Sequence, residues 1–433
     1  MSTLLPVLPA SMLLTQNPLQ LLGLTQEEVM DAHHHLGGRN GKKVQDKVVA
    51  RGDEQTLPFA MPDVQFNDLL GFLDPKAAQQ LRSAAKIADF LPFDVKRFPL
   101  VGPPWPLTSN SLQLMSAIKG SRFVGSGLLL ATDASVVDGR RVIAEGRGLY
   151  TSNSAVQSMV DYAKGRFQRA YSINPLAPNA IDDLKRAAEA GVKAVKLFFA
   201  IWGFLANGKL ADDKTLTLPE MRQLNAFYDA LADLGMVTIV HTSYEASIHG
   251  DEFYKLHGGD PTTLKEALFD RDITTVLAHT GGYMNHLPGF EHIQHHMASA
   301  AHYMKTYPNV YGDIAGALSR GYEFIGAFLK YIDDIKDKLI FGTDFSLEPT
   351  DPQVMFQQAQ ERLQQKGIPA RSREVDEANS SLARAFSLDP HLERTKNPLD
   401  RYFLMMLIAL REMGLSREEI RNVFTRMKTL IAQ

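Results

Sequence analysis

The sequence predicts an α/β fold: a (β/α)8, or TIM, barrel with a long insertion after the first strand and a helical C-terminal extension. Two patterns predict it. Short apolar runs rich in Val, Ile, Leu and Phe recur along the chain, as is typical of strands buried on both faces of a parallel sheet. Longer amphipathic stretches separate them, as crossover helices would. About eight such units in one chain of this size favour a closed barrel over an open sheet.

We expect eight short strands, separated by helices that begin and end at residues typical of helix termini. One expected helix, 180–190, follows Asn179 as N-cap and ends at Gly191, and another, 219–234, begins with Pro219. Two more are expected at 261–270 and 290–307. The expected strands are 28–35, 122–132, 167–174, 192–199, 236–241, 273–279, 309–315 and 338–344.

Three segments fall outside the repeat, and we treat the whole chain, 1–433, as one domain. Residues 4–14 are apolar, but the first basic residue is Arg39, so a signal peptide is disfavoured. We expect residues 1–26 to be an extension packed on the body. The barrel, 27–350, contains an insertion at 36–121, which either caps the barrel mouth or is a surface excursion. It includes an expected helix at 74–89.

Residues 351–433 form the expected helical extension. Its helices are predicted at 354–365, 372–386, 399–413 and 417–430. The segment 402–410 is apolar nearly all round, which favours a buried packing helix, with a subunit interface of a homo-oligomer as the alternative.

Composition excludes several classes of protein. The chain has 46 Lys and Arg against 49 Asp and Glu, a net charge of −3, which excludes a strongly basic nucleic-acid-binding protein. No apolar run approaches the roughly 20 residues of a membrane span. The chain contains no cysteine, which excludes disulfides and thiolate ligands and fits a reducing cytoplasm. Any metal must therefore be held by His, Asp, Glu or a modified Lys.

Histidines and an aspartate stand where the expected strands end. His33 and His35 alternate on one face of the first strand together with Asp31, so their imidazoles can converge on one divalent metal. The same alternation places His279, which ends the sixth strand, on one face with Leu277. The C-terminal strand ends of a barrel surround one cavity, and we expect a common metal site there. The further candidates are His241, His279 and Asp344, at the ends of the fifth, sixth and eighth strands.

Lys196 lies near the end of the fourth strand. Alternation places it with Ala194, so it points into the barrel if Ala194 does. An ammonium beside a divalent metal is electrostatically unfavourable. Three roles therefore stay open: a carbamate bridging two metals, a cation that orients substrate or pairs with Asp344, or a side chain reaching solvent.

Four further histidines, at 292, 295, 296 and 302, lie in an expected helix. The first three share a face, and we interpret them as helix surface or interface instead of a second metal site.

Short segments along the chain match one family in that family's order: 31–36, 173–176, 191–197, His241, 278–281, 307–311, 341–345 and 418–424. Together they resemble the amidohydrolase superfamily, in particular its amidohydrolase-related branch, amidohydrolase 2. The resemblance implies a (β/α)8 barrel in which His33 and His35 bind metal, His241 and His279 bind metal or substrate, and Asp344 binds metal and acts as general base. Met427 departs from the Asn that many relatives carry.

The expected activity is hydrolysis of a C–N or C–O bond of a small molecule, with one or two divalent ions. Zn is the expected metal, with Mn or Fe as alternatives. A lyase on the same site, decarboxylase or hydratase, and a non-catalytic barrel that binds a ligand or partner are the alternatives. Arg39, Tyr244 and Tyr283 lie in loops near the expected mouth and could contact substrate, or could be solvated loop residues.

Overall fold

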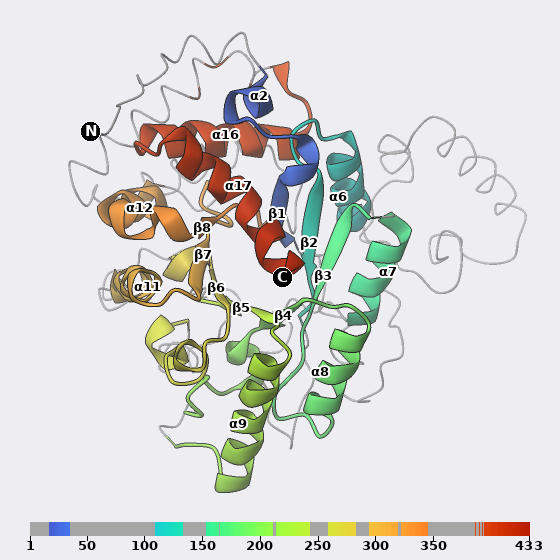
Figure 1. Ribbon diagram of the computed structural model, residues 1–433, viewed down its shortest axis with the longest axis vertical. Coiled ribbons are helices and arrows are strands. Elements are labelled where there is room, and N and C mark those ends of the chain that lie inside the picture. The colour runs from blue at the N-terminus through green and yellow to red at the C-terminus, as the bar shows by residue number, and fades with distance from the viewer. Residues whose placement is uncertain are drawn as a thin grey trace, which may run out of the picture.

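Eight parallel strands form one sheet that curls into a nearly closed barrel (Figure 1). The computed structural model describes residues 17–34, 109–132, 153–163, 165–210, 214–242, 259–282, 294–318, 322–344, 386, 389, 392 and 394–433. Each strand pairs with the next along the chain, from β1 to β8. The strands are β1 Met30–His34, β2 Ser126–Leu130, β3 Phe167–Tyr171, β4 Ala194–Leu197, β5 Val237–His241, β6 Thr275–Ala278, β7 Val310–Asp313 and β8 Leu339–Ile340.

Backbone hydrogen bonds also join the first strand to the segment after the last. The Ala32 N–H donates to the Phe341 carbonyl (3.0 Å), and the Asp344 N–H donates to the His33 carbonyl (3.1 Å). These bonds close the seam between β1 and β8, so the ends of both strands meet at the same place. The predicted barrel and all eight predicted strands are confirmed, each observed strand being shorter than predicted.

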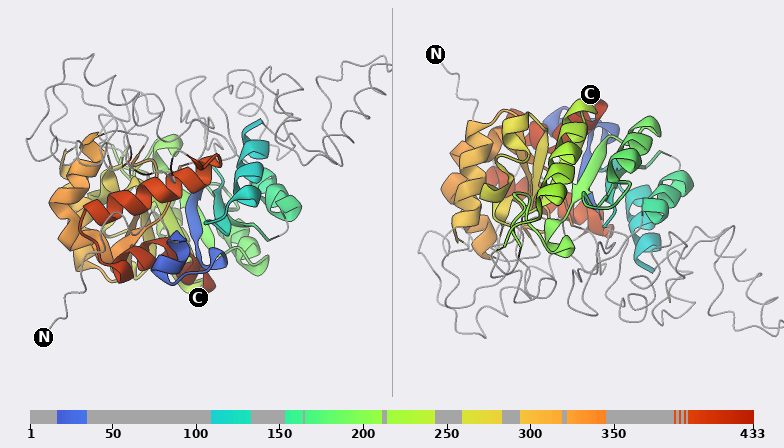
Figure 2. Two further views of the ribbon diagram at one scale, coloured as in Figure 1. Left: turned by 90° about the horizontal axis from the view of Figure 1, so that it is seen from above. Right: turned by 90° about the horizontal axis from the view of Figure 1, so that it is seen from below.

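Helices surround the strands (Figures 1 and 2). The predicted helix 261–270 is wrong: the chain there forms two 3-10 turns, Pro261–Leu264 and Phe269–Arg271, and leaves them with Asp272 in the left-handed region (φ 57°). The predicted helices 74–89 and 354–365 lie outside the described residues, as does 372–386 apart from its last residue. The described α-helices are α2 Pro18–Leu22, α6 Ser109–Gly120, α7 Asn153–Ala163, α8 Ala180–Glu189, α9 Leu218–Asp233, α11 Gln294–Thr306, α12 Tyr322–Ile335, α16 Pro398–Glu412 and α17 Arg417–Ala432.

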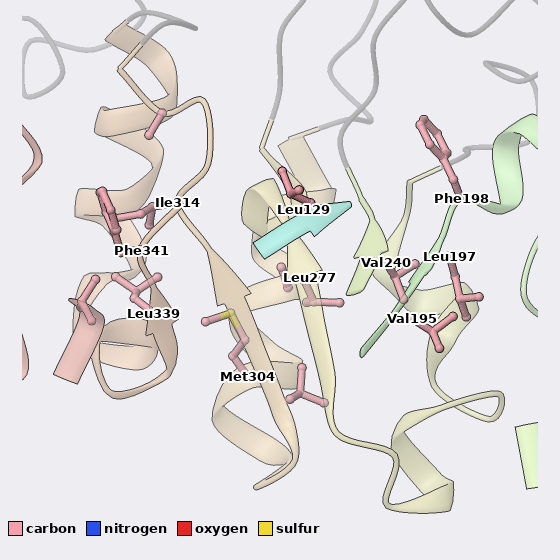
Figure 3. Packing of buried hydrophobic residues seen from close by; sticks show 14 of the residues in the cluster. Leu129, Val195, Leu197, Phe198, Val240, Leu277, Met304, Ile314, Leu339 and Phe341 are labelled. Atoms are coloured by element: carbon pink, nitrogen blue, oxygen red, sulfur yellow. The ribbon is translucent and has the colours of Figure 1, made fainter. Parts of the chain in front are cut away.

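Buried hydrophobic residues form two layers. An inner cluster fills the barrel, and Met427 and Leu430 of α17 belong to it, so α17 closes one end of the barrel. Met427, the residue that departs from the family pattern, is 1% exposed and packs as a core side chain. The outer cluster joins strands to helices; Figure 3 shows part of it, including Leu277, Met304 and Phe341.

α2 and α16 are part of this outer layer. Leu19 and Leu22 of α2 are buried in it. Every residue of α16 from Tyr402 to Leu410 is buried, which confirms the predicted packing helix.

His296 of α11 is 2% exposed, so the expectation that it lies on a helix surface is wrong. None of the described helices is long and apolar enough to cross a membrane.

Candidate metal centre

The regular alternation of β1 breaks just before the site. The pairing register with β2 shifts between Asp31 and His34, which is the signature of a bulge. Ala32 packs in the inner cluster, while Asp31 Oδ2 lies 3.3 Å from His34 Nε2, and the His34 ring meets the edge of Phe167 in the outer layer. The predicted shared face of Asp31 and His33 is therefore wrong, because one extra residue changes which side chains face the barrel.

Asp31 supports the backbone behind the site. Its Oδ1 accepts the N–H groups of His33 (3.1 Å) and Thr343 (3.0 Å), and so ties the end of β1 to the segment after β8. Burial raises the pKa of the Asp31 carboxyl to about 7, against these hydrogen bonds, which lower it. The residue acts on the placement of His33 through the backbone.

His33 has one ring nitrogen held and the other turned toward a carboxylate. Its Nδ1 lies 2.8 Å from Asp313 Oδ2, and its Nε2 lies 3.7 Å from Asp344 Oδ1. His33 and Asp313 are fully buried. Burial by itself would raise the pKa of Asp313, but the charge and hydrogen bond of His33, the His279 N–H and the charge of Lys196 hold it below its ordinary value.

Asp313 is the residue that sequence reasoning missed. It ends β7 as the polar residue after Val310, Tyr311 and Gly312, the same signal that identified His241 and Asp344. Its Oδ1 accepts the N–H of His279 (2.7 Å) and of Ala315 (3.1 Å). With Oδ2 on His33, both carboxylate oxygens are engaged in organising the site.

His279 reaches the site through a turn. Val276 and Ala278 lie in the inner cluster and Leu277 in the outer one, so alternation would send His279 outward with Leu277. The predicted face is therefore wrong, but the residue does reach the site, because its backbone is left-handed (φ 65°). Its Nδ1 lies 3.0 Å from the Ala315 carbonyl oxygen and therefore donates to it.

The remaining predicted strand-end residues gather around it. The ring centre of His279 lies 4.8 Å from that of His33 and 5.0 Å from that of His241. His241 in turn stacks on Phe198 at 4.1 Å. The Asp344 side chain is 15% exposed and its backbone is also left-handed (φ 56°).

Lys196 lies inside the barrel. Ala194 is in the inner cluster and Lys196 is fully buried, so the alternative in which its side chain reaches solvent is wrong. The other two roles stay open. His35, Arg39, Tyr244 and Tyr283 lie outside the described residues.

Two features mark this cluster as a candidate metal centre. His33, His279 and Asp313 each offer a ligand atom within 4.8 Å of the others. Among the described residues, four that are not glycine have positive φ, and three of them, His279, Thr280 and Asp344, lie here. Strained backbone of this kind concentrates at functional sites, where the surroundings hold it in place.

Comparison with known proteins adds a family. A family model described as amidohydrolase matches residues 127–378, more than half of the chain. Comparison with curated proteins gave no match.

Solved structures similar to this chain are distant from it. An uncharacterized TIM-barrel protein from Bordetella bronchiseptica is 16% identical, with a TM-score of 0.36 over 89% of this chain and 99% of that one. A probable 2-pyrone-4,6-dicarboxylic acid hydrolase from Acinetobacter baumannii, with citric acid bound, is 11% identical, with a TM-score of 0.45 over 94% and 100%. A 5-carboxyvanillate decarboxylase from Novosphingobium aromaticivorans, with bound manganese, is 12% identical, with a TM-score of 0.37 over 89% and 97%. The family assignment rests on the family model.

Proposed function

The chain belongs to the amidohydrolase family, and we propose that it is a metal-dependent enzyme that hydrolyses a C–N or C–O bond of a small molecule. The observation that carries the proposal is the geometry of His33. Its Nδ1 is held by the Asp313 carboxylate at 2.8 Å, while its Nε2 faces Asp344 Oδ1 at 3.7 Å.

This pair of distances fits a bound cation. When the proton lies on Nδ1, Nε2 can bind a cation through its lone pair, and the Asp344 carboxylate that faces it would share that cation. The separation of 3.7 Å is too long for a good hydrogen bond. It is close to the roughly 3.3 Å between two ligand atoms of a tetrahedral zinc ion. A metal-binding histidine is also usually supported by a carboxylate that accepts the N–H of its other ring nitrogen, as Asp313 does here at Nδ1.

We assign the ligands accordingly. His33, His35, His241 and Asp344 would hold a divalent metal, with Zn proposed and Mn or Fe as alternatives. His279 is held through Nδ1 by the Ala315 carbonyl, and we propose that it binds the metal or the substrate.

Lys196 has one of two roles in this assignment. It would help to hold a second ion as a carbamate, or it would remain an ammonium that orients substrate or pairs with Asp344. Its complete burial fits either role, because both place the side chain inside the barrel.

The protein's own part in hydrolysis is proton transfer and orientation. A divalent ion at this position supplies an acidified water molecule and polarises the scissile bond. The Asp344 carboxylate accepts the proton of the attacking water and returns it to the leaving group. Asp313 keeps His33 in the tautomer that leaves Nε2 as acceptor.

Arg39, Tyr244 and Tyr283 are proposed to contact the substrate. We further propose a cytoplasmic protein whose whole chain, 1–433, is one domain.

Product analysis tests the reaction class. The enzyme is incubated in ¹⁸O-labelled water with a panel of small amides, esters, lactones and carboxylic acids, and products are identified by mass spectrometry. We expect a product with one ¹⁸O atom from water, and none after the metal is removed with a chelator. Release of carbon dioxide, or addition of water without bond cleavage, would contradict hydrolysis and support the lyase alternative.

A further inference from the structure

The chain turns left-handed for three residues directly after β6. The φ angles are 65° at His279, 51° at Thr280 and 67° at Gly281. This region is unfavourable for residues with a Cβ atom, and a β-branched residue such as Thr seldom occupies it. The turn nevertheless has a consequence for the site, because it brings the His279 ring to His33 instead of to the side of Leu277. Such a conformation persists only where neighbouring groups enforce it.

Two buried threonine hydroxyls enforce this one. Thr280 Oγ1 donates to the Asp313 carbonyl at 2.6 Å. Thr242 Oγ1 donates to the Ala278 carbonyl at 2.7 Å and accepts the Gly281 N–H at 2.9 Å, so it bridges the two ends of the turn. Both threonines are fully buried. Their hydrogen bonds are therefore shielded from competing water.

The same hydroxyls connect the elements that carry the site. Thr242 directly follows His241 at the end of β5, and Thr280 directly follows His279. Asp313, whose carbonyl receives the Thr280 hydroxyl, holds His33 with its carboxylate. The ends of β5, β6 and β7 are thus tied together beside His241, His279 and Asp313.

Two glycines mark close packing around the turn. A Cβ atom on Gly281 would lie 2.6 Å from the His296 carbonyl oxygen of α11. One on Gly312 of β7 would lie 2.5 Å from Thr280 Oγ1. Glycine at these two positions makes room for the helix on one side and for the Thr280 hydroxyl on the other.

We propose that Thr242 and Thr280 are positioning residues, whose hydroxyls fix the imidazoles of His241 and His279 relative to Asp313 and so set the affinity for the divalent metal. Neither threonine is proposed to contact the metal or the substrate. The inference rests on the proposed function, since it requires that the cluster binds a metal.

Isosteric substitutions test this. Thr242→Val and Thr280→Val keep the β-branched shape and remove only the hydroxyl, whereas Thr242→Ser and Thr280→Ser keep the hydroxyl. Affinity for Zn²⁺ is measured by competition with a chromophoric chelator, and ligand geometry by the visible spectrum of the cobalt(II) protein. We expect each Val variant to bind Zn²⁺ about tenfold more weakly with an altered cobalt spectrum, and each Ser variant to stay within about twofold of the wild type.

Thr275→Val is the matched control. Thr275 is equally buried, lies on the same strand at its other end and donates its hydroxyl to the Ile273 carbonyl at 2.9 Å. Its loss should lower stability and leave the affinity and spectrum unchanged. Wild-type affinity in both Val variants, or equal weakening by Thr275→Val, would overturn the inference alone. A wild-type protein that binds neither ion would overturn the proposed function as well. Thr→Ala variants at the two positions replace any Val variant that does not fold.

Discussion

Asp344→Asn should lower turnover about a thousandfold, in the range that loss of a general base produces. The Asn side chain has nearly the same shape but cannot accept the proton of the attacking water. The substitution should also leave the backbone conformation unchanged. Asp344 has a φ of 56°, and Asn tolerates the left-handed region as readily as Asp does.

The control is Asp272→Asn. Asp272 is also left-handed (φ 57°), but it lies in the turn before β6, at the opposite end of that strand from His279. The initial rate with any substrate found in the product screen is compared for the two variants and the wild type, with circular dichroism as a check on folding. Unchanged turnover in Asp344→Asn would contradict the assignment of this residue as general base.

Asp313→Asn should weaken metal binding by about ten- to a hundredfold, the usual effect of removing the support of a metal-binding histidine. The amide oxygen can replace Oδ1 and still accept the N–H groups of His279 and Ala315. The NH₂ group would then face His33 Nδ1 and donate to it. The imidazole proton would move to Nε2, and a hydrogen would point at Asp344 where the proposed ligand lone pair belongs.

The same substitution should lower the free energy of unfolding by about 1 to 2 kcal/mol, because it replaces a buried, charge-assisted hydrogen bond with a neutral one. Zn²⁺ affinity is measured by chelator competition and stability by urea unfolding. Asp270→Asn serves as the control, because Asp270 is a surface carboxylate hydrogen-bonded to Lys265 and Tyr307. None of these residues is assigned to the metal centre. If Asp313→Asn bound Zn²⁺ as tightly as the control variant, the orienting role of Asp313 would be refuted.

Much of the fold could be predicted from sequence because strand burial leaves a direct trace in composition. β4, β5 and β6 read as apolar runs, since parallel strands in a barrel are covered on both faces. α16 could likewise be predicted as buried, because it is apolar nearly all round. The 3-10 turns at Pro261–Leu264 and Phe269–Arg271 were not predicted from the sequence. At the second turn a residue distant in sequence takes part, since the Asn309 amide donates to the Phe269 and Ile273 carbonyls.

The site was predicted less completely, for reasons of local backbone geometry. Alternation assumes a regular strand, and it fails where β1 bulges between Asp31 and His34 and where His279 turns left-handed. Both departures depend on tertiary partners, among them the Thr343 N–H and the Thr242 hydroxyl, which lie far from them in sequence. Asp313 carried the same strand-end signal as the predicted residues, so a uniform application of that rule would have found it.

The central claim is that the strand ends hold a divalent metal, and metal content tests it most directly. Protein purified without chelators and without an affinity tag is analysed by elemental mass spectrometry, alongside the variant that combines His33→Ala with His35→Ala. The account predicts about one or two equivalents of Zn, Mn or Fe in the wild type, lost from the double variant. A wild-type protein that stays metal-free even after incubation with those ions would contradict it, and would make a non-catalytic barrel the better account of the chain.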